Sequence, residues 1–528
     1  MNSFNFKKWN NILGWFVFTI ALTTYWLTVE PTASFWDAGE YITTSSNLEV
    51  GHPPGAPLYQ LLGAFFSIFA MESTNIALTI NLMSVFASAF TVLFMFWSLT
   101  LLLVNIISKN NIITKESSYA ILGSAVIGSL TFAFSDSFWF NAVEAEVYAM
   151  AAFIMSVLFY LALRWEKDMQ TPRGDRWVVL IAFVIGLSFG VHFMGLLTIP
   201  AMGMLYFFKN YKTVTIKNFI VANLVMVAIL LFIFKLLLPM TLKFFSASEI
   251  FFINSIGLPF NSGTIIAGIL FIALFYLLLR YTRNNDFVKL NTLLLSILFI
   301  FIGFSSWIML PVRANAGTMI NENNPNNARE LLAYYNREQY PETHLFHGPL
   351  FTEKYVGLDP NNPYKDDKPK FEKDEKNGKY IIANDYVNAS QNTDDSQKGF
   401  FPRMWSTEHS SNYMEFTGGL EYSIKREYLG ESRLVDIVKD FNQDIREGRV
   451  GADDFDNFLK DFGPFLDIQK PTFIQNMAYM FEYQFGYMYW RYFMWNFSGR
   501  QDDKQGEYKD LHGNWLSGIS FIDDARLG

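Results

Sequence analysis

The stretch ALTINLMSVFASAFTVLFMFWSLTLLLVNII, residues 77–107, decides the class of fold. It contains no charged residue. As a helix rising ~1.5 Å per residue, it is longer than the ~30 Å hydrocarbon core of a bilayer. Eight further apolar runs raise the number of candidate transmembrane helices to nine. The nine runs are 12–29, 77–107, 119–135, 147–163, 177–191, 193–208, 218–238, 263–280 and 290–310. We therefore predict a mainly α-helical, polytopic membrane protein.

Charge divides the 528-residue chain into two parts. Residues 1–310 contain 16 Lys and Arg against 14 Asp and Glu, whereas residues 311–528 contain 25 against 35. The sequence therefore predicts a transmembrane domain over 1–310 and a soluble domain, helical or mixed, over 311–528. We expect the soluble domain to be the start of a longer C-terminal region.

Composition excludes several classes of protein. Without cysteine the chain cannot be a disulfide scaffold, a Cys-based zinc protein or a thiol enzyme. The soluble part is acidic, so we expect no nucleic-acid partner. The 54 Phe, 26 Tyr and 13 Trp are too many for a disordered chain. The sequence also lacks a P-loop, a dinucleotide-binding fingerprint and a hydrolase nucleophile elbow.

The positive charges predict the orientation. With the N-terminus in the cytoplasm, the predicted cytoplasmic segments carry 14 Lys and Arg. The opposite loops, 30–76, 136–146 and 239–262, carry only Lys243. Because cytoplasmic loops are enriched in Lys and Arg, this places everything after residue 310 outside the cytoplasm. The run 57–70 is too short to span, so we expect an interfacial helix.

The first outer loop contains FWDAGEYITTSSNLEVGHPPGAPLY, residues 35–59. Asp37 and Glu40 are three residues apart and would share one face of a helix. Asp37 also lies where a helix N-cap is expected, so an ordinary capping role stays open. The Gly-His-Pro-Pro-Gly segment at 51–55 then ends the helix, and His52 is either a turn residue or part of a site.

This loop resembles the first outer loop of GT-C glycosyltransferases. Trp-Asp-Ala-Gly-Glu-Tyr at 36–41 and Gly-His-Pro-Pro-Gly at 51–55 are most similar to a bacterial multi-span family related to the animal transmembrane protein O-mannosyltransferases. The similarity continues through 141–148, 190–192, 311–314 and 488–497. It implies a GT-C-like bundle of about nine transmembrane helices. It also implies inverting transfer of a sugar, mannose in these relatives, from a polyprenyl-phosphate donor to Ser or Thr of translocated proteins.

The resemblance and the chemistry together assign candidate residues. Inverting transfer needs a carboxylate that takes the acceptor proton, and the resemblance matches it to Asp37, with Glu40 beside it. The departing phosphate needs cationic or donor groups, for which Arg313, His52 and Arg491 are candidates. Candidates for the sugar and acceptor pocket are Tyr41, Glu144, Glu146, Tyr148 and His192.

Structural alternatives stay open for several of these residues. Glu144 and Glu146 would also suit a helix N-terminus, where the helix dipole favours acids. Glu144 and Tyr148 are four residues apart and are expected to share the cavity, whereas Glu146 would point elsewhere once the helix has begun. His192 is equally readable as a core histidine and Arg313 as an anchor for lipid headgroups.

No cofactor is expected beyond the polyprenyl-phosphate sugar, no metal ligand is assigned, and a divalent ion stays an open question. The expected location is the bacterial inner membrane, with membrane lipids, translocated acceptor proteins and further membrane proteins as partners. Two alternatives remain: transfer of the sugar to a lipid or surface polysaccharide, and a non-catalytic scaffold or transporter. The twelve aromatic residues in 471–497 predict a core or interfacial helix, or rings that cover the sugar or lipid donor.

Overall fold

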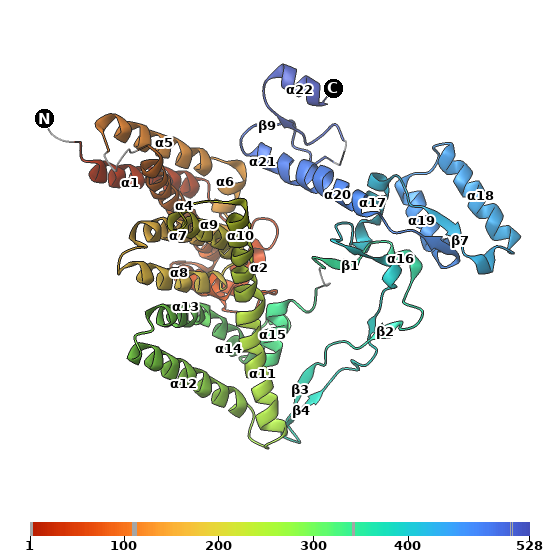
Figure 1. Cartoon of the computed structure of the whole chain (residues 1–528), viewed down its shortest axis with the longest axis horizontal. Coiled ribbons are helices and arrows are strands. Elements are labelled where there is room, and N and C mark those ends of the chain that lie inside the picture. The colour runs from red at the N-terminus through yellow and green to blue at the C-terminus, as the bar shows by residue number, and fades with distance from the viewer. Residues whose placement is uncertain (1–3, 108–112, 341–343, 507, 509, 528) are drawn as a thin grey trace. The chain divides into compact units, whose positions relative to one another are not determined.

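The computed structural model describes residues 4–107, 113–340, 344–506, 508 and 510–527 (Figure 1). Lys109, one of the cations used to predict the orientation, lies outside the described residues. The chain forms two compact units. The first comprises Met1–Tyr340 and Asp374–Tyr380, and the second comprises Pro341–Lys373 and Ile381–Gly528.

The first unit is helical. Its α-helices are α1 (Phe6–Leu27), α2 (Ala38–Ser46), α3 (Pro57–Ser67), α4 (Ile76–Ile107), α5 (Lys115–Ala133), α6 (Asp136–Ala142), α7 (Val147–Asp168), α8 (Gly174–Ser188), α9 (Thr198–Asn210), α10 (Ile216–Leu231), α11 (Leu238–Asn254), α12 (Ser262–Asn284), α13 (Val288–Phe304), α14 (Met309–Asn315) and α15 (Ala328–Asn336). Short 3₁₀ turns include η3 (Phe193–Leu197) and η5 (Ser305–Ile308), and η4 (Phe232–Leu237) is a π-helical segment. In Figure 1, α7, α8, α13 and α12 form successive neighbouring layers.

Several of these helices are suited to a membrane, but the number differs from the nine predicted. The described residues contain five helices that are long and apolar enough to span a bilayer. A sixth arises if α5 and α6, which bend by 68° at their junction, are taken as one broken span. The predicted runs 177–191 and 193–208 become α8 and α9, of 15 and 13 residues, because α8 ends at Ser188 and the 3₁₀ turn η3 occupies 193–197. A span needs ~20 residues.

The predicted outer loop 239–262 is also different in the structure. α10, η4 and α11 run on as one apolar helix over Ile216–Asn254, 39 residues long. Pro239, where we expected the span to end, is the second residue of α11, which directly follows the π-helical segment η4. A locally widened helix can accommodate the missing proline N–H, so the proline does not terminate the helix. Lys243 therefore lies on α11 rather than in a loop.

Small residues allow the closest helix pair in the first unit. A Cβ atom added at Gly186 on α8 would lie 2.2 Å from the Ile300 carbonyl oxygen of α13. One added at Gly303 would lie 2.4 Å from the Phe183 carbonyl oxygen. Two glycines facing each other let the two backbones touch, which is the packing expected between helices in a membrane.

The second unit combines helices with short two-stranded ladders. Its helices are α16 (Glu353–Val356), α17 (Ser410–Thr417), α18 (Ser432–Arg446), α19 (Ala452–Phe462), α20 (Phe473–Ala478), the π-helical η10 (Tyr479–Trp490), α21 (Arg491–Trp495) and α22 (Ser520–Leu527). Its strands are β1 (His347–Pro349), β2 (Tyr364–Lys365), β5 (Ser390–Gln391), β6 (Lys398–Phe400), β7 (Tyr422–Ile424), β8 (Leu466–Ile468), β9 (Gly499–Arg500) and β10 (Trp515–Leu516). Strands β3 (Phe371–Asp374) and β4 (Lys379–Ile382) flank the segment that belongs to the first unit.

The core of the second unit lies between α16, α17, α18, α19 and β8. Phe441 on α18 stacks on Phe458 on α19 with ring centroids 3.7 Å apart. Asp456 on α19 is buried, but it accepts hydrogen bonds from Lys354 and Tyr355 of α16. Because a buried carboxylate is costly without partners, this network is what allows the acid in the core.

Candidate active site

The helix predicted from the first outer loop is present as α2, and Asp37 occupies its N-cap position. Within the described residues, however, the Asp37 side chain makes no capping hydrogen bond. Its carboxylate is 58% exposed. The preceding residue, Trp36, has a φ of 60°, a conformation that is uncommon for residues other than glycine and is found at functional sites. The ordinary capping role considered for Asp37 is therefore absent from this structure.

Glu40 and His52 form the best-defined pair in the loop. The His52 backbone N–H donates to Glu40 Oε1 at 2.7 Å, and His52 Nδ1 lies 3.0 Å from Glu40 Oε2. The other ring nitrogen, Nε2, lies 3.9 Å from Asp37 Oδ2. His52 therefore stands between the two carboxylates of α2, held by one and close to the other.

The two members of this pair shift each other's ionisation. The hydrogen bond to Glu40 raises the pKa of His52, and this outweighs the lowering caused by burial. Burial works to raise the pKa of Glu40, but the hydrogen bonds from the His52 ring and backbone outweigh it and leave this pKa below its usual value. Both shifts favour an ionised pair.

Contacts with α15 and with the segment after α14 hold the backbone around His52. Gly51 leaves room for the Glu40 carboxylate, since a Cβ atom there would lie 2.6 Å from Glu40 Oε1. The Gly51 carbonyl accepts a hydrogen bond from the buried Tyr334 hydroxyl of α15 at 2.5 Å. Val50 pairs with the segment after α14, donating to the Ile320 carbonyl and accepting from the Glu322 N–H. The turn is thus part of the first unit's core.

A cavity of about 540 Å³ opens in front of this pair. Its wall combines α2, the Gly-His-Pro-Pro-Gly turn, the start of α7, the segment before η3 and the residues after α15. The lining residues are Asp37, Glu40, Tyr41, His52, Pro53, Pro54, Gly55, Glu146, Val147, Tyr148, Phe189, Val191, His192, Phe193, Arg337 and Tyr340. Six of the expected site residues thus surround one cavity together with Glu146, which we expected to point elsewhere.

Glu146 and Glu144 exchange the orientations that helical spacing suggested. α7 begins only at Val147, so Glu146 is its extended N-cap residue rather than part of its first turn. Its Oε1 accepts a hydrogen bond from the Asp37 N–H at 3.1 Å, and the side chain lines the cavity. Glu144 instead accepts a 2.5 Å hydrogen bond from Ser34 and lies outside the cavity lining. The spacing argument failed because the helix starts later than assumed.

Glu146 differs electrostatically from an ordinary surface acid. Burial, followed by the charge of Asp37 and then that of Glu144, raises the pKa of Glu146 to about 7. Near neutral pH this carboxyl group is therefore partly protonated. It can donate a hydrogen bond in one state and carry a second negative charge beside Asp37 in the other.

His192 and Tyr148 form another part of the wall. Their rings lie 5.5 Å apart, and His192 Nδ1 accepts a hydrogen bond from the Met194 N–H at 3.1 Å. Burial lowers the pKa of His192, which favours its neutral form. Tyr41 is buried at the base, with its ring 5.8 Å from His52 and 5.3 Å from Tyr59.

Two of the three groups proposed for the donor phosphate lie elsewhere. Arg313 on α14 donates to the carbonyl oxygens of Leu48 at 2.5 Å and Asn47 at 3.1 Å, at the end of α2. Arg491 belongs to the second unit, is buried, and donates to the Tyr487 hydroxyl and the Gln505 carbonyl. Both guanidinium groups thus contact protein, and both lie outside the cavity lining.

An arginine that we did not predict, Arg337, lines the cavity. It directly follows α15, with a φ of 56°, and its guanidinium carbon lies 4.3 Å from the centre of the Tyr340 ring. Both residues line the cavity. The sequence around Arg337 offers no motif that marks it, because its place depends on how α15 packs back onto α11 and the first loop.

Asp37, Glu40 and His52 are also the group among the described residues that could hold a metal ion. One ligand atom from each lies within 4.8 Å of the others. Carboxylate oxygens and imidazole nitrogen suit several divalent ions. In this structure both Glu40 oxygens are already hydrogen-bonded to His52, whereas Asp37 Oδ2 lies 3.9 Å from His52 Nε2.

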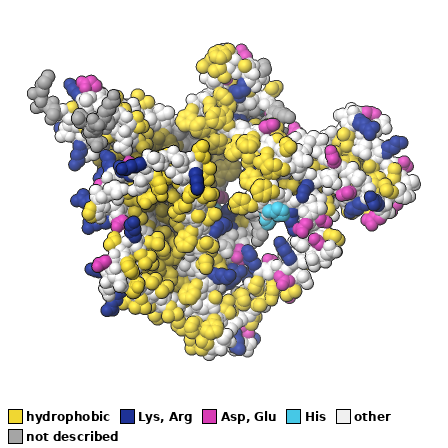
Figure 2. Space-filling view, viewed as in Figure 1, with side chains coloured by type: hydrophobic (Ala, Val, Ile, Leu, Met, Phe, Trp, Pro, Cys, Tyr) yellow, Lys and Arg dark blue, Asp and Glu magenta, His cyan; other side chains and the backbone are white. Residues whose placement is uncertain are grey.

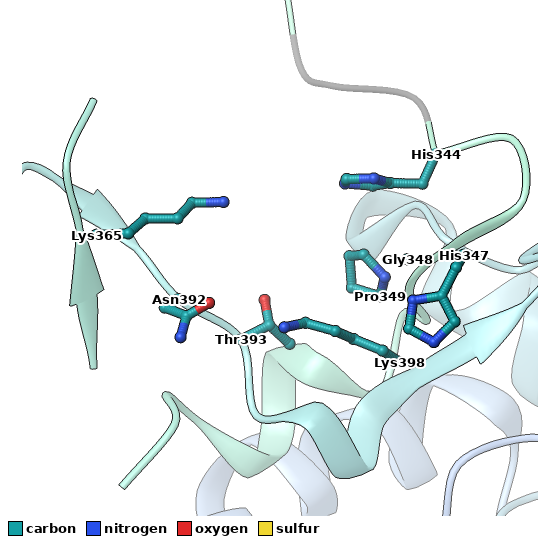
Figure 3. A pocket seen from close by; sticks show the side chains of 8 residues that line it. All are labelled: His344, His347, Gly348, Pro349, Lys365, Asn392, Thr393 and Lys398. Carbon is teal, nitrogen blue, oxygen red and sulfur yellow. The ribbon is translucent and has the colours of Figure 1, made fainter. Parts of the chain in front are cut away.

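A second, smaller cavity, of about 250 Å³, lies in the second unit (Figure 3). His347 of β1 and Lys398 of β6 share one face of an antiparallel ladder, since Lys398 pairs with Pro349, two residues from His347. His344 and Lys365 also point into it in Figure 3. The two histidines, three residues apart in sequence, thus face lysines, and such cationic surroundings disfavour a metal ion.

The comparisons with known proteins match the chain in two segments. Residues 37–215 match the family model of the protein O-mannosyl-transferase TMEM260 N-terminal domain. Residues 341–481 match a family of unknown function, DUF8416. The first match starts at Asp37 and includes the cavity residues up to Phe193, whereas Arg337 and Tyr340 lie outside both matched segments.

Individual relatives agree with the first match. The protein O-mannosyl-transferase TMEM260 of Mus musculus is 26% identical over 172 residues, which are 33% of this chain and 22% of the mouse protein. The tmem260 protein O-mannosyl-transferase of Dictyostelium discoideum is 25% identical over 154 residues, which are 29% of this chain and 17% of that protein. The chain thus matches less than a quarter of the length of either relative. No solved structure matches it. The chain is related to the animal O-mannosyltransferases through this segment.

Proposed function

We propose that this chain is an inverting glycosyltransferase that transfers a sugar, mannose, from a polyprenyl-phosphate donor to a Ser or Thr hydroxyl of a protein. The observation that carries the proposal is the Asp37 carboxylate. It lies at the N-cap of α2 without capping it and faces a 540 Å³ cavity. It also lies in the segment that matches the O-mannosyltransferase family model.

Asp37 is the proposed base. As the acceptor oxygen attacks the anomeric carbon, its proton moves to the Asp37 carboxylate and a new C–O bond forms. The bond between the anomeric carbon and the phosphate oxygen breaks, and its electron pair leaves with the polyprenyl phosphate. No general acid is required, because a phosphate ester oxygen is already a good leaving group. The carboxylate charges of Asp37 and, when ionised, Glu146 also stabilise an oxocarbenium-like transition state.

Arg337 and His52 are the proposed partners of the departing phosphate. Arg337 is the arginine of the cavity wall, and its guanidinium can donate two parallel hydrogen bonds to phosphate oxygens. His52 is held toward its protonated form by Glu40, so it can supply a second positive charge. We assign Arg313 a different role, that of holding the end of α2 through the Leu48 and Asn47 carbonyls.

Glu146, Tyr148 and His192 are the proposed contacts of the sugar or acceptor hydroxyls. They line the side of the cavity formed by the start of α7 and the segment before η3. A partly protonated carboxyl, a phenol and a neutral imidazole can each both donate and accept hydrogen bonds. The charge bias of the loops supports placing this cavity on the outer face of the membrane.

Transfer by membranes containing the Asp37→Asn variant tests the proposal. With polyprenyl-phosphate mannose and a Ser/Thr-rich acceptor peptide, we expect the native chain to glycosylate the peptide. We expect Asp37→Asn to lose at least about 100-fold in rate, as for a removed general base. Glu72→Gln is the matched control, because Glu72 is an exposed acid of the same loop that lies outside the cavity lining.

The same assay separates the alternatives. If the sugar is found on lipid or polysaccharide and the peptide is unmodified, the acceptor is a lipid or a glycan rather than a protein. No transfer by the native chain to any of these would favour the scaffold or transporter. An Asp37→Asn variant as active as the native chain would overturn the assignment of the base.

A further inference from the structure

The aromatic run predicted at 471–497 forms one continuous helix of the second unit, through α20, η10 and α21. Its middle is π-helical, so each turn is wider than in an α-helix and residues four apart stay on one face over a longer distance. Two stripes with a spacing of four residues result. The inner stripe is Tyr479, Tyr483, Tyr487, Arg491 and Trp495, and the outer stripe is Phe481, Phe485, Tyr489, Phe493 and Phe497.

The inner stripe packs against its own unit. Tyr479 is part of the core between α17 and α19, and its ring lies 5.2 Å from that of Tyr413. Arg491 is buried, with its guanidinium carbon 3.8 Å from the centre of the Tyr487 ring. Next to this stripe, Gln484 accepts a hydrogen bond from Arg403 Nε at 2.9 Å. One side of the helix is therefore covered by protein of the same unit.

The outer stripe is exposed along its whole length. Its five aromatic side chains are between 39% and 61% exposed. Trp490, Met488 and Ile474 widen the patch, and Figure 2 shows hydrophobic side chains gathered over α20 and α21. In 473–497, all of which the structure describes, the charged residues are Glu482 and the buried Arg491. Monomers in water rarely leave an apolar patch of this extent uncovered.

We propose that this outer aromatic stripe lies in the interfacial layer of the membrane, parallel to the bilayer surface. The chain carries several helices suited to spanning a membrane, so a bilayer is always within reach of the second unit. Phe, Tyr and Trp rings with few charges are what the headgroup boundary accommodates best. The helix cannot span the bilayer alone, because its inner stripe is already packed on protein.

The composition of the stripe favours lipid over a protein partner. A protein interface usually has a rim of charged or polar groups that pair with the partner. Here the exposed rings continue through Phe493 and Phe497, and the exposed charge within residues 473–497 is Glu482. A stripe with so few charges lacks such a rim, and aromatic rings of this kind are enriched at membrane–water interfaces.

The absence of cysteine from the chain makes the test direct. The full chain carrying Phe485→Cys or Phe493→Cys is labelled with a nitroxide and reconstituted into phosphatidylcholine–phosphatidylglycerol vesicles. The control is Asp436→Cys, at an exposed position of α18. Electron paramagnetic resonance then measures collisions of each label with oxygen, which concentrates in lipid, and with a water-soluble nickel chelate.

We expect the oxygen-to-nickel collision ratio at 485 and 493 to exceed that at 436 several-fold. A ratio at 485 and 493 equal to that at 436 would place the stripe in water and overturn the proposal. Few collisions with either reagent would show that protein covers the stripe, from a second copy or another part of the chain, and would also overturn it. Because each variant changes one exposed ring, folding is not at risk, and the two positions check each other.

Discussion

At the scale of single residues, the three acids of the cavity differ in whether their carboxylates accept hydrogen bonds. Both carboxylate oxygens of Glu40 are hydrogen-bonded to His52, and Glu146 accepts a hydrogen bond from the Asp37 backbone N–H. Asp37, by contrast, lies at a helix N-terminus without capping it. An acid at that position would gain about 0.5–2 kcal/mol from capping, so this structure leaves a stabilising contact unmade where the proposed chemistry needs the group.

The raised pKa of Glu146 predicts how activity depends on pH. As the pH rises through about 7, Glu146 loses its proton and adds a negative charge beside Asp37. This charge repels the donor phosphate, so the KM for the donor should rise across this range. In Glu146→Gln the rise should be smaller than in the native chain, because the contribution of Glu146 is removed. Steady-state kinetics between pH 6 and 8.5 measure it, with Glu72→Gln, an exposed acid outside the cavity lining, as the control.

The hydrogen bond to Glu40 raises the pKa of His52, and this imidazole also loses its proton as the pH rises. Loss of its proton also weakens donor binding, but this effect persists in Glu146→Gln. If the variant keeps the full native rise in KM, the pH dependence belongs to His52, and the role given to Glu146 is wrong.

The Glu40–His52 pair is predicted to stabilise the fold over a limited range of pH. The folded-state pKa of His52 lies above its usual 6.5 and that of Glu40 below its usual 4.5. The pair therefore stabilises the fold fully between these two usual values. The contribution is lost as the pH rises through the raised pKa of His52, and also as it falls through the lowered pKa of Glu40.

Thermal unfolding of the detergent-solubilised chain measures this window. Glu40→Gln should lower the free energy of unfolding by about 1–3 kcal/mol near pH 5.5, as for a lost hydrogen bond to a charged group. The difference between variant and native chain should shrink at alkaline pH. A difference that stays constant from pH 5.5 to 9 would mean that packing, not charge, dominates at this position.

At the scale of secondary-structure elements, the site depends on the contacts between α2, α14 and α15. Arg313 of α14 and Tyr334 of α15 hold carbonyl oxygens of residues 47, 48 and 51, so both support the turn that carries His52. Elements far apart in sequence thus fix one loop, and this explains why the first unit extends to Tyr340.

Arg313→Ala tests whether this arginine positions the loop or binds the donor. We expect a loss of about 1–3 kcal/mol in stability, because two carbonyl oxygens lose their donor. We also expect a lower kcat with little change in the KM for the donor, and partial recovery in Arg313→Lys. A large rise in the KM for the donor with unchanged thermal stability would instead show that Arg313 binds the donor phosphate.

The local elements near the site were more predictable than their ends. α2 ends at Ser46, before Gly51, where we expected it to stop. The start of this helix after Asp37 and the short helix from Pro57 follow from turn residues and spacing. The start of α7 did not, because Glu144–Glu146 could equally begin the helix, and a shift of two residues decided which acid faces the cavity. The place of Arg337 in the cavity could not be predicted from the sequence, because it results from the tertiary packing of α15.

At the scale of the whole molecule, apolar composition predicted a helical membrane protein, and the described residues contain five or six helices able to span. The nine predicted spans are not confirmed, because hydropathy alone does not register where helices end: the runs 177–191 and 193–208 become helices of 15 and 13 residues. The charge split placed a boundary at 310, whereas the two compact units divide at 340, which depends on contacts that sequence patterns do not show.

The central claim is that the cavity before Asp37 binds the lipid-linked sugar with its phosphate toward Arg337. An experimental density map of the chain with a polyprenyl mannosyl phosphonate, which cannot transfer its sugar, tests this most directly. The account predicts the sugar between Asp37 and Glu146, with the phosphonate at Arg337 and His52. A phosphonate bound at Arg313 or elsewhere, with the cavity free of sugar, would contradict it.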